Sequence, residues 1–361
     1  MDKEIVANFE NLYLSYKKVK ADKKFNSGTA RFSNMALEGI QLLKEQLENQ
    51  TYSINPYNKF QIYEPKERTI ESCAFKDKVV QRCFSDYILT PKMNNIFIKW
   101  NAAGQSGKGQ HMAINGLRNH MLEFYKKHGL NGYIVKCDIR KYFYSIDHEI
   151  MKDVLDYYFD DEFTVWLNHL FIDSTENPGL PLGNQVNQKY ALLLLHSLDQ
   201  MITIEYGIPY YGRYNDDFYV ICKTKECARE ILEAIRMMVK SLKLELNTKS
   251  QIVPFRMGIC YLGFHHYVTI DGKYIRKLRS DKKRKTQRKI RNWVRAVNNG
   301  EMTEEKFQEK YNACKNHMLH GNCIKLCHSM DLDVKKRMKR GDEKCSCKLS
   351  TQEVTTETAM F

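Results

Sequence analysis

Two adjacent acids interrupt an apolar, aromatic stretch of the chain and are its strongest candidates for chemistry. Asp216 and Asp217 lie in "YGRYNDDFYVIC", residues 211–222, whose flanks are typical of strands. Burying an unpaired carboxylate costs free energy, and neighbouring carboxylates repel each other. Asn215 and Asp216 favour a turn, so we expect the acidic pair at the tip of a hairpin. A positively charged ligand such as a metal ion would offset their charge.

A third acid, Asp138, follows the apolar segment "YIVKC" 78 residues before Asp216. Carboxylates that converge can hold two divalent cations about 3.5–4 Å apart, an arrangement that supports in-line displacement at phosphorus. Magnesium needs only a few carboxylates when substrate phosphates complete its coordination. Asp138 alone could equally be the polar end of a strand, so its role as a metal ligand depends on the other motifs of the chain.

Composition favours a globular protein with a polyanionic partner. The 361 residues are 43% hydrophobic and 12% aromatic, and their formal net charge is +14. There is no run of 18 apolar residues and the first residues do not resemble a signal peptide, so we expect a cytoplasmic protein without a membrane span. The eleven scattered cysteines fit reduced, mostly buried thiols.

Hydrophobic periodicity predicts the elements that would position the acids. We expect helices in residues 1–50, 76–97, 110–127 and 225–242, and another beginning after the N-cap Asp147. Paired strands are expected in residues 52–75, a strand in 132–143, and a hairpin with an Asp271–Gly272 turn in 261–278. The glycine-rich loop 104–110, "GQSGKGQ", lacks the Gly-Lys-Ser/Thr ending of a P-loop, so we interpret it as a basic loop near template or nucleotide.

Over nearly its whole length, the chain resembles reverse transcriptases, which are right-hand polymerases. Seven segments carry the resemblance in the expected order: "KERTIESCAFKDKVVQ" from residue 66, "GQSGKGQHMAINGL" from 104, "VKCDIRKYF" from 135, "GLPLGNQVNQ" from 179, "YNDDF" from 214, "LNTKS" from 246 and "YLGF" from 261. The resemblance implies an α+β fold with fingers, a palm containing an antiparallel sheet, and a helical thumb. We expect residues 1–130 to be fingers with part of the palm, 131–265 palm, 266–345 basic thumb and 346–361 a flexible tail.

The resemblance also assigns roles by position. It implies that Asp138, Asp216 and Asp217 hold two Mg²⁺ ions, and that Lys249 lies near the leaving pyrophosphate as a possible proton donor. The residues implied around the incoming deoxynucleotide are Lys66, Arg68, Ile139, Phe143, Gly183 and Gln188. Phe143 is similar to the aromatic gate that would clash with a ribose 2′-hydroxyl. Ordinary core, strand-end or surface roles remain the alternatives for Phe143, Arg68 and Lys249.

The segment "GLPLGNQVNQ" departs from the common Gln-Gly-x-x-x-Ser-Pro pattern. Leu182 replaces the glutamine, Asn187 the serine and Gln188 the proline. An aliphatic residue before the glycine resembles bacterial enzymes of diversity-generating retroelements, in the superfamily that includes group II intron and retron enzymes. That likeness implies error-prone cDNA synthesis from a template RNA and a small basic ring-forming accessory protein. The alternatives are an anti-phage defence enzyme and a non-catalytic basic RNA-binding scaffold.

The C-terminal region is strongly basic. Residues 276–295 contain eleven lysines and arginines, which would bind phosphates with a steep salt dependence and could grip an RNA/cDNA duplex. A solvated surface helix is the alternative. The histidines and cysteines that follow are His317, His320, Cys323, Cys327, His328, Cys345 and Cys347. Their spacing matches common zinc sites poorly, so we expect thiols that are buried or in the tail.

Overall fold

The two central strands of a four-stranded sheet, Tyr133–Asp138 and Asp217–Cys222, are rich in β-branched and aromatic residues. The computed structural model describes residues 1–21, 27–63 and 67–338. These residues form two compact units: one comprises Met1–His120 and Asn131–Val253, and the other Met121–Leu130 and the described residues from Pro254 onward. Lys66, Cys345, Cys347 and the expected tail 346–361 lie outside the described residues.

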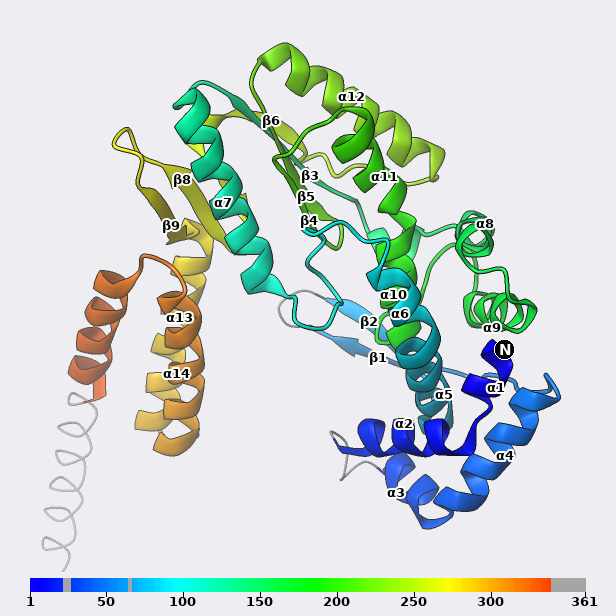
Figure 1. Ribbon diagram of the computed structural model, residues 1–361. Helices are drawn as coiled ribbons and strands as arrows, with labels where there is room; N and C mark the ends of the chain where they lie inside the picture. Colours follow the sequence, from blue (N-terminus) through cyan, green and yellow to red (C-terminus); the bar gives the residue numbers. More distant parts are fainter. Residues whose placement is uncertain (22–26, 64–66, 339–361) are drawn as a thin grey trace, which may run out of the picture. The chain divides into compact units, whose positions relative to one another are not determined.

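The first unit contains most of the helices and two sheets (Figure 1). Its α-helices are α1 (Asp2–Val6), α2 (Phe9–Ala21), α3 (Ser27–Asn34), α4 (Ala36–Glu48), α5 (Phe75–Phe84), α6 (Thr90–Asn94), α8 (His148–Tyr158), α9 (Glu162–Ile172), α10 (Gln185–Leu194), α11 (His196–Gln200) and α12 (Lys225–Ser241). Two π-helical turns, η1 (Ser85–Leu89) and η3 (Met201–Glu205), and one 3₁₀ turn, η2 (Tyr142–Ser145), interrupt them. Helix α7 (Gln110–His128) contributes residues to both units.

A four-stranded sheet with the order β4-β5-β3-β6 forms the frame of the first unit. Its strands are β3 (Tyr133–Asp138), β4 (Tyr211–Tyr214), β5 (Asp217–Cys222) and β6 (Gln251–Pro254). A separate antiparallel pair consists of β1 (Asn58–Ile62) and β2 (Arg68–Ser72). Helix α12 packs on β3 and β5 through one apolar face that includes Ile231, Ile235 and Val239. Burial of this face anchors the sheet.

The second unit combines a three-stranded antiparallel sheet with helices, of which α13 is strongly basic. The sheet has the order β7 (Ile259–Tyr261), β8 (Phe264–Val268) and β9 (Tyr274–Leu278), after the 3₁₀ turn η4 (Phe255–Met257). Helices α13 (Ser280–Asn298) and α14 (Glu304–Leu319) follow, and then a helix over residues 324–338. Ile290 and Val294 give α13 a buried stripe, while its lysines and arginines lie largely on the exposed side.

Most of the elements expected from periodicity are confirmed, but the strand expected over residues 132–143 ends at Asp138, and Tyr142–Ser145 form the 3₁₀ turn η2. Helices fill most of residues 1–50, Asp147 accepts a hydrogen bond from the Ile150 backbone N–H at 3.2 Å as the N-cap of α8, and β8 and β9 form the hairpin closed at Asp271–Gly272. Gly272 has φ +77°, and a Cβ there would lie 2.8 Å from Tyr125 Cε1, so the turn requires glycine. Cys323 and Cys327 are buried thiols. The α+β class is confirmed as well.

No helix in the three described ranges is both long enough and apolar enough to span a membrane.

Candidate active site

The register of β3 against β5 places Asp138 directly opposite Asp217. Strands β4 and β5 form the expected hairpin, and its turn consists of Asn215, with φ +55°, and Asp216. Asparagine tolerates this left-handed conformation better than most residues, because its side chain is short and polar. Asp138 and the acidic pair Asp216–Asp217, which begins 78 residues later in the sequence, therefore meet at one end of the β3–β5 pair.

The Asp217 carboxylate has a cationic partner. Lys136 lies two residues before Asp138 on β3, so both side chains emerge on the face of the sheet that Asp217 shares. The Lys136 Nζ forms an ion pair with the Asp217 Oδ1, and it also donates to the Cys137 carbonyl at 3.1 Å. This pair neutralises one of the three negative charges.

Asp138 is held by the segment that leads into β6. Asn247 Nδ2 donates to Asp138 Oδ2 at 3.0 Å, and the Asn247 backbone N–H donates to the Asp138 carbonyl at 2.7 Å. Ser250 Oγ lies 3.3 Å from the Asp138 backbone nitrogen, which donates to it. These bonds fix the Asp138 side chain and leave one of its carboxylate oxygens for a ligand.

Asp216 has the least compensated charge of the three acids. Burial, followed by the negative charge of Asp138, raises the pKa of Asp216 to about 6. Among the described residues, no other side chain donates a hydrogen bond to its carboxylate. Hard oxygen donors with an uncompensated negative charge fit a divalent cation such as Mg²⁺. Within the described part of the chain, no group of three or more His, Cys, Asp or Glu side chains is arranged so that it could hold a metal ion by itself.

A buried ion pair stabilises the turn formed by Asn215 and Asp216. Arg213 and Asp199 both have 0% exposed side chains, and Arg213 Nε donates to Asp199 Oδ1 at 2.7 Å. The guanidinium also donates to the Asn215 carbonyl at 3.1 Å and to the Leu192 carbonyl at 3.1 Å. Tyr211 Oη completes the network by donating to Asp199 Oδ1 at 2.6 Å. Arg213 thus ties α10 and α11 to the turn that carries Asp216.

Phe143 and Gly183 lie where backbone segments of the first unit meet. Phe143 is half-buried in η2, and its carbonyl accepts a hydrogen bond from the Leu180 N–H at 2.7 Å. Gly183 is exposed with φ +114°, and a Cβ there would lie 3.5 Å from Ile70 Cγ2 on β2. The segment from Leu180 to Gly183 therefore links η2 to the strand that begins at Arg68.

The other expected site residues are less closely connected to the three acids. Arg68 is exposed at the start of β2, and Gln188 is exposed on α10. The Lys249 side chain is exposed, while its backbone N–H donates to Asn247 Oδ1 at 3.1 Å. Ile139 is buried and bridges to Leu246. Their assigned roles stay predictions, as do the metal roles of the three aspartates.

Sequence reasoning missed Lys136, Asn247, Arg213 and Asp199. Lys136 could have been found from strand periodicity, because residues two apart on a strand share a face. Arg213 carries a weaker signal, a lone cation between aromatic residues of a predicted strand. Asp199 and Asn247 carry no local signal, since only tertiary contacts bring them to their partners.

The chain is similar to one known protein family and to solved structures of other proteins. A sequence profile of the family described as reverse transcriptase (RNA-dependent DNA polymerase) matches residues 40–266. No curated protein matches the chain. Among solved structures, the apo telomerase of Candida tropicalis truncated from its C-terminal domain is 10% identical with a TM-score of 0.49, over 64% of this chain and 58% of that one. The Candida albicans telomerase in complex with a TWJ fragment of telomeric RNA is 10% identical with a TM-score of 0.48, over 81% of this chain and 61% of that one. The chain thus spans about three fifths of these structures.

Replacing Arg213 should destabilise the protein far more than replacing a surface arginine. Arg213→Met leaves Asp199 buried and unpaired, so we expect the free energy of unfolding to fall by about 3–5 kcal/mol. Denaturant unfolding measures this value. The matched control is Arg236→Met, which removes an exposed ion pair with Glu233 (3.2 Å) and should cost less than about 1 kcal/mol. Equal losses in both variants would contradict the supporting role of the buried pair.

Neutralising Asp216 should stabilise the protein without bound metal. The folded-state pKa of about 6 lies above the ordinary 3.8, so the charged form costs stability above pH 6. We expect Asp216→Asn to raise the free energy of unfolding at pH 7.5 by about 1–3 kcal/mol. The gain should shrink between pH 6 and 3.8 and vanish below pH 3.8. Denaturant unfolding in a chelator-treated buffer across this pH range tests the prediction, with the exposed Asp153→Asn as the control. A loss of stability in Asp216→Asn at pH 7.5 would refute the prediction.

Proposed function

The chain belongs to the reverse transcriptase family, and we propose that it is an RNA-directed DNA polymerase that copies a template RNA into cDNA from deoxynucleoside triphosphates. The fold is the α+β right-hand polymerase fold expected from the sequence. One observation carries the proposal: Asp138 and the poorly compensated Asp216 lie together at the end of the β3–β5 pair. Such a pair suits a metal-dependent nucleotidyl transfer.

Asp138 and Asp216 would hold Mg²⁺, with Asp217 as the second acid of the "YNDDF" segment. Two Mg²⁺ ions, when bound, supply charge neutralisation for the triphosphate and activation of the primer 3′ oxygen. Lys136 supports this assignment, because its ion pair restrains Asp217 and lowers the repulsion around Asp138. Asn247 supports it as well, because it orients the Asp138 carboxylate.

The remaining predicted residues would handle the nucleotide. Lys66 and Arg68 would contact the triphosphate, and a guanidinium suits bidentate phosphate binding. Phe143 would exclude a ribose 2′-hydroxyl, Gly183 would allow close backbone approach, and Lys249 would protonate the leaving pyrophosphate. Ile139 and Gln188 would line the same nucleotide position.

The domain assignment follows the same proposal. Residues 1–130 would be fingers with part of the palm, 131–265 palm, and 266–345 thumb. The lysines and arginines exposed on α13 support a duplex-gripping thumb, because they can neutralise phosphates without reading sequence. Template RNA and the RNA/cDNA duplex are therefore the proposed partners.

We further propose that the enzyme serves a diversity-generating retroelement of a bacterium, with a small basic ring-forming accessory protein in the cytoplasm. Leu182 in place of glutamine supports this assignment, since loss of an amide removes a possible hydrogen bond to the nucleotide. Near-identical template and variable repeats that differ at adenines should lie beside the gene. Their absence would contradict the assignment and favour a defence-associated enzyme.

Asp216→Asn should abolish deoxynucleotide incorporation on a primed RNA template while leaving RNA affinity nearly unchanged. The substitution removes a cation-binding charge but keeps the shape of the turn. Primer extension with Mg²⁺ and equilibrium RNA binding measure the two properties, with Asp153→Asn as the control. Turnover retained by Asp216→Asn would refute the metal role. Wild-type protein that binds RNA without extension would instead indicate a non-catalytic scaffold.

Phe143→Ala should increase ribonucleotide use. Truncating the half-buried ring opens space beside the Phe143–Leu180 backbone contact, where we expect the sugar to lie. The ratio of kcat/KM for a ribonucleotide to that for the matching deoxynucleotide should rise by about tenfold or more. Tyr144→Ala, at the adjacent position, is a useful comparison. An unchanged ratio in Phe143→Ala would show that Phe143 packs the core and does not select the sugar.

A further inference from the structure

The first unit has an open pocket of about 710 Å³ between α12 and η3, which we call the α12 pocket. Its apolar lining consists of Met201 and Tyr206 at the two ends of the η3 segment and of Met237 and Met238 on α12. The side chains through which α12 packs on β3 and β5, such as Ile231, do not line it. None of the three predicted metal ligands lines it either. The α12 pocket is therefore separate from the candidate active site.

Two of the apolar side chains in the α12 pocket are unusually exposed. Met237 is 67% exposed and Tyr206 is 39% exposed. The side of an amphipathic helix that faces away from the core is ordinarily polar. Apolar side chains that gather on such a side and have polar residues around them are typical of a surface that binds another protein. Methionine suits such a surface, because its flexible side chain adapts to the shape of a partner.

The charge of the α12 pocket is opposite to that of the whole chain. Glu205, Glu230 and Glu233 line the pocket and no lysine, arginine or histidine does, although the chain has a formal net charge of +14. Glu233 forms an exposed ion pair with Arg236 at 3.2 Å. Within the described ranges, Glu205 and Glu230 have no ion-pair partner, and both are exposed. Such a lining repels phosphate groups and attracts cations.

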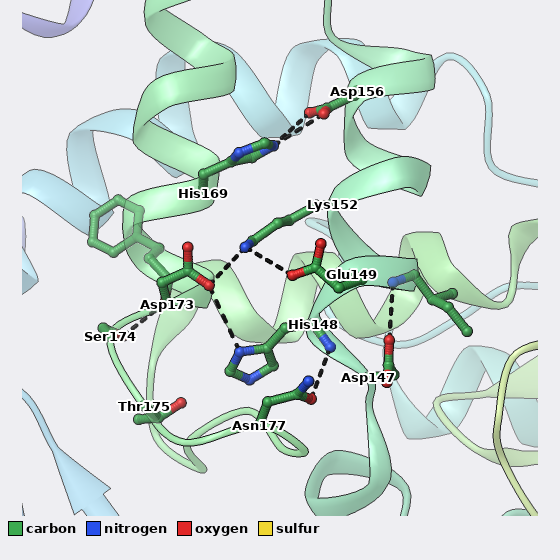
Figure 2. Close-up of polar contacts among 12 residues, drawn as sticks. Asp147, His148, Glu149, Lys152, Asp156, His169, Asp173, Ser174, Thr175 and Asn177 are labelled. Carbon is green, nitrogen blue, oxygen red and sulfur yellow. Dashed lines mark hydrogen bonds and ion pairs between the residues drawn. The ribbon is translucent and has the colours of Figure 1, made fainter.

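Acids that stabilise the first unit are used differently. Glu149 and Asp173 both form ion pairs with Lys152 Nζ, at 3.1 and 2.8 Å, and thereby join α8 to the segment after α9 (Figure 2). Glu205 and Glu230 make no comparable connection among the residues that the structure describes. Their charges therefore remain for the cations of another molecule.

We propose that the α12 pocket binds a basic amphipathic helix of a partner protein. Apolar side chains spaced three and four residues apart on that helix would insert between the methionines and Tyr206, as in other helix-in-groove complexes. Lysines or arginines beside the apolar stripe would pair with Glu205 and Glu230. Charge complementarity of this kind accelerates association and excludes partners with acidic surfaces. The lining charge argues against nucleic acid as the occupant, since phosphates would meet three carboxylates.

A synthetic peptide tests the pocket directly. The probe is a fluorescein-labelled peptide of about 18 residues, long enough to form a helix, with leucines along one face and lysines on the other. The reference peptide has the same composition, with its leucines distributed around the helix. Fluorescence anisotropy at low ionic strength measures both affinities, because salt screens exposed charges. We expect the full-length protein to bind the amphipathic peptide at least about tenfold more tightly than the reference peptide.

Variants of exposed residues locate the binding without disturbing the core. Met237→Ser and Glu230→Lys should each weaken binding of the amphipathic peptide about tenfold. Met35→Ser is the matched control for the methionine, because Met35 is 62% exposed in the same unit. Glu38→Lys on α4 is the control for the charge, because it changes the net charge of the chain by the same amount as Glu230→Lys. Both controls should leave the affinity unchanged.

Weaker binding in Met237→Ser and Glu230→Lys, but not in the two controls, would support a site for a basic helix. Equal affinity for the two peptides, or equal effects of the pocket variants and the controls, would overturn it. A dimer of the wild-type protein in sedimentation velocity that Met237→Ser abolishes would also overturn it, because a second copy of the chain would then cover the pocket. Asp216→Asn should bind the peptide like the wild type, so the result does not depend on the proposed polymerase activity.

Discussion

The antiparallel register between β3 and β5 is the constraint on which the candidate site depends. It sets Asp138 opposite Asp217 and places the turn with Asp216 beside both. A shift of one residue would move Asp138 to the other face of the sheet and disperse the acids. The apolar residues of the strands and the packing of α12 hold the register, because slippage would expose Ile134, Val220 or their neighbours. Burial far from the site therefore determines its geometry.

Some charged side chains near the candidate site have partners of opposite charge and others do not. This difference distinguishes the groups that stabilise the fold from the candidate reactive group. Arg213 and Asp199 are fully buried and satisfied by each other, by Tyr211 and by backbone carbonyls. Asp217 is satisfied by Lys136. Asp216 has no such partner and its pKa is raised. A group that lowers stability amid satisfied neighbours is best explained by a ligand that it binds, which is why perturbed acids mark functional sites.

The sequence predicted the strand end and the turn that carry the acids because the signals for both are local. Strand patterning placed Asp138 at a strand end, and Asn215 with Asp216 indicated the turn. The resemblance to a family then related segments that are far apart in the chain. The network around Arg213 was not predictable in the same way, since its partners lie on α10, α11 and the hairpin turn. Pairing of this kind depends on how helices pack, and no periodicity encodes it.

The sequence likewise did not predict that the loop 173–182 is rigid. Its polar residues look like a solvated loop in the sequence, because no apolar pattern or motif distinguishes "DSTENPG". Only the contacts of His148, Lys152 and Tyr57 with this segment reveal that it is rigid. Hydrogen-bonding groups held at fixed positions around a cavity can select a ligand. The same groups on a mobile loop would bind more weakly, because ordering the loop costs conformational entropy. The hydrogen bonds and the ion pair that hold this loop at a fixed position are more than chain connection alone requires.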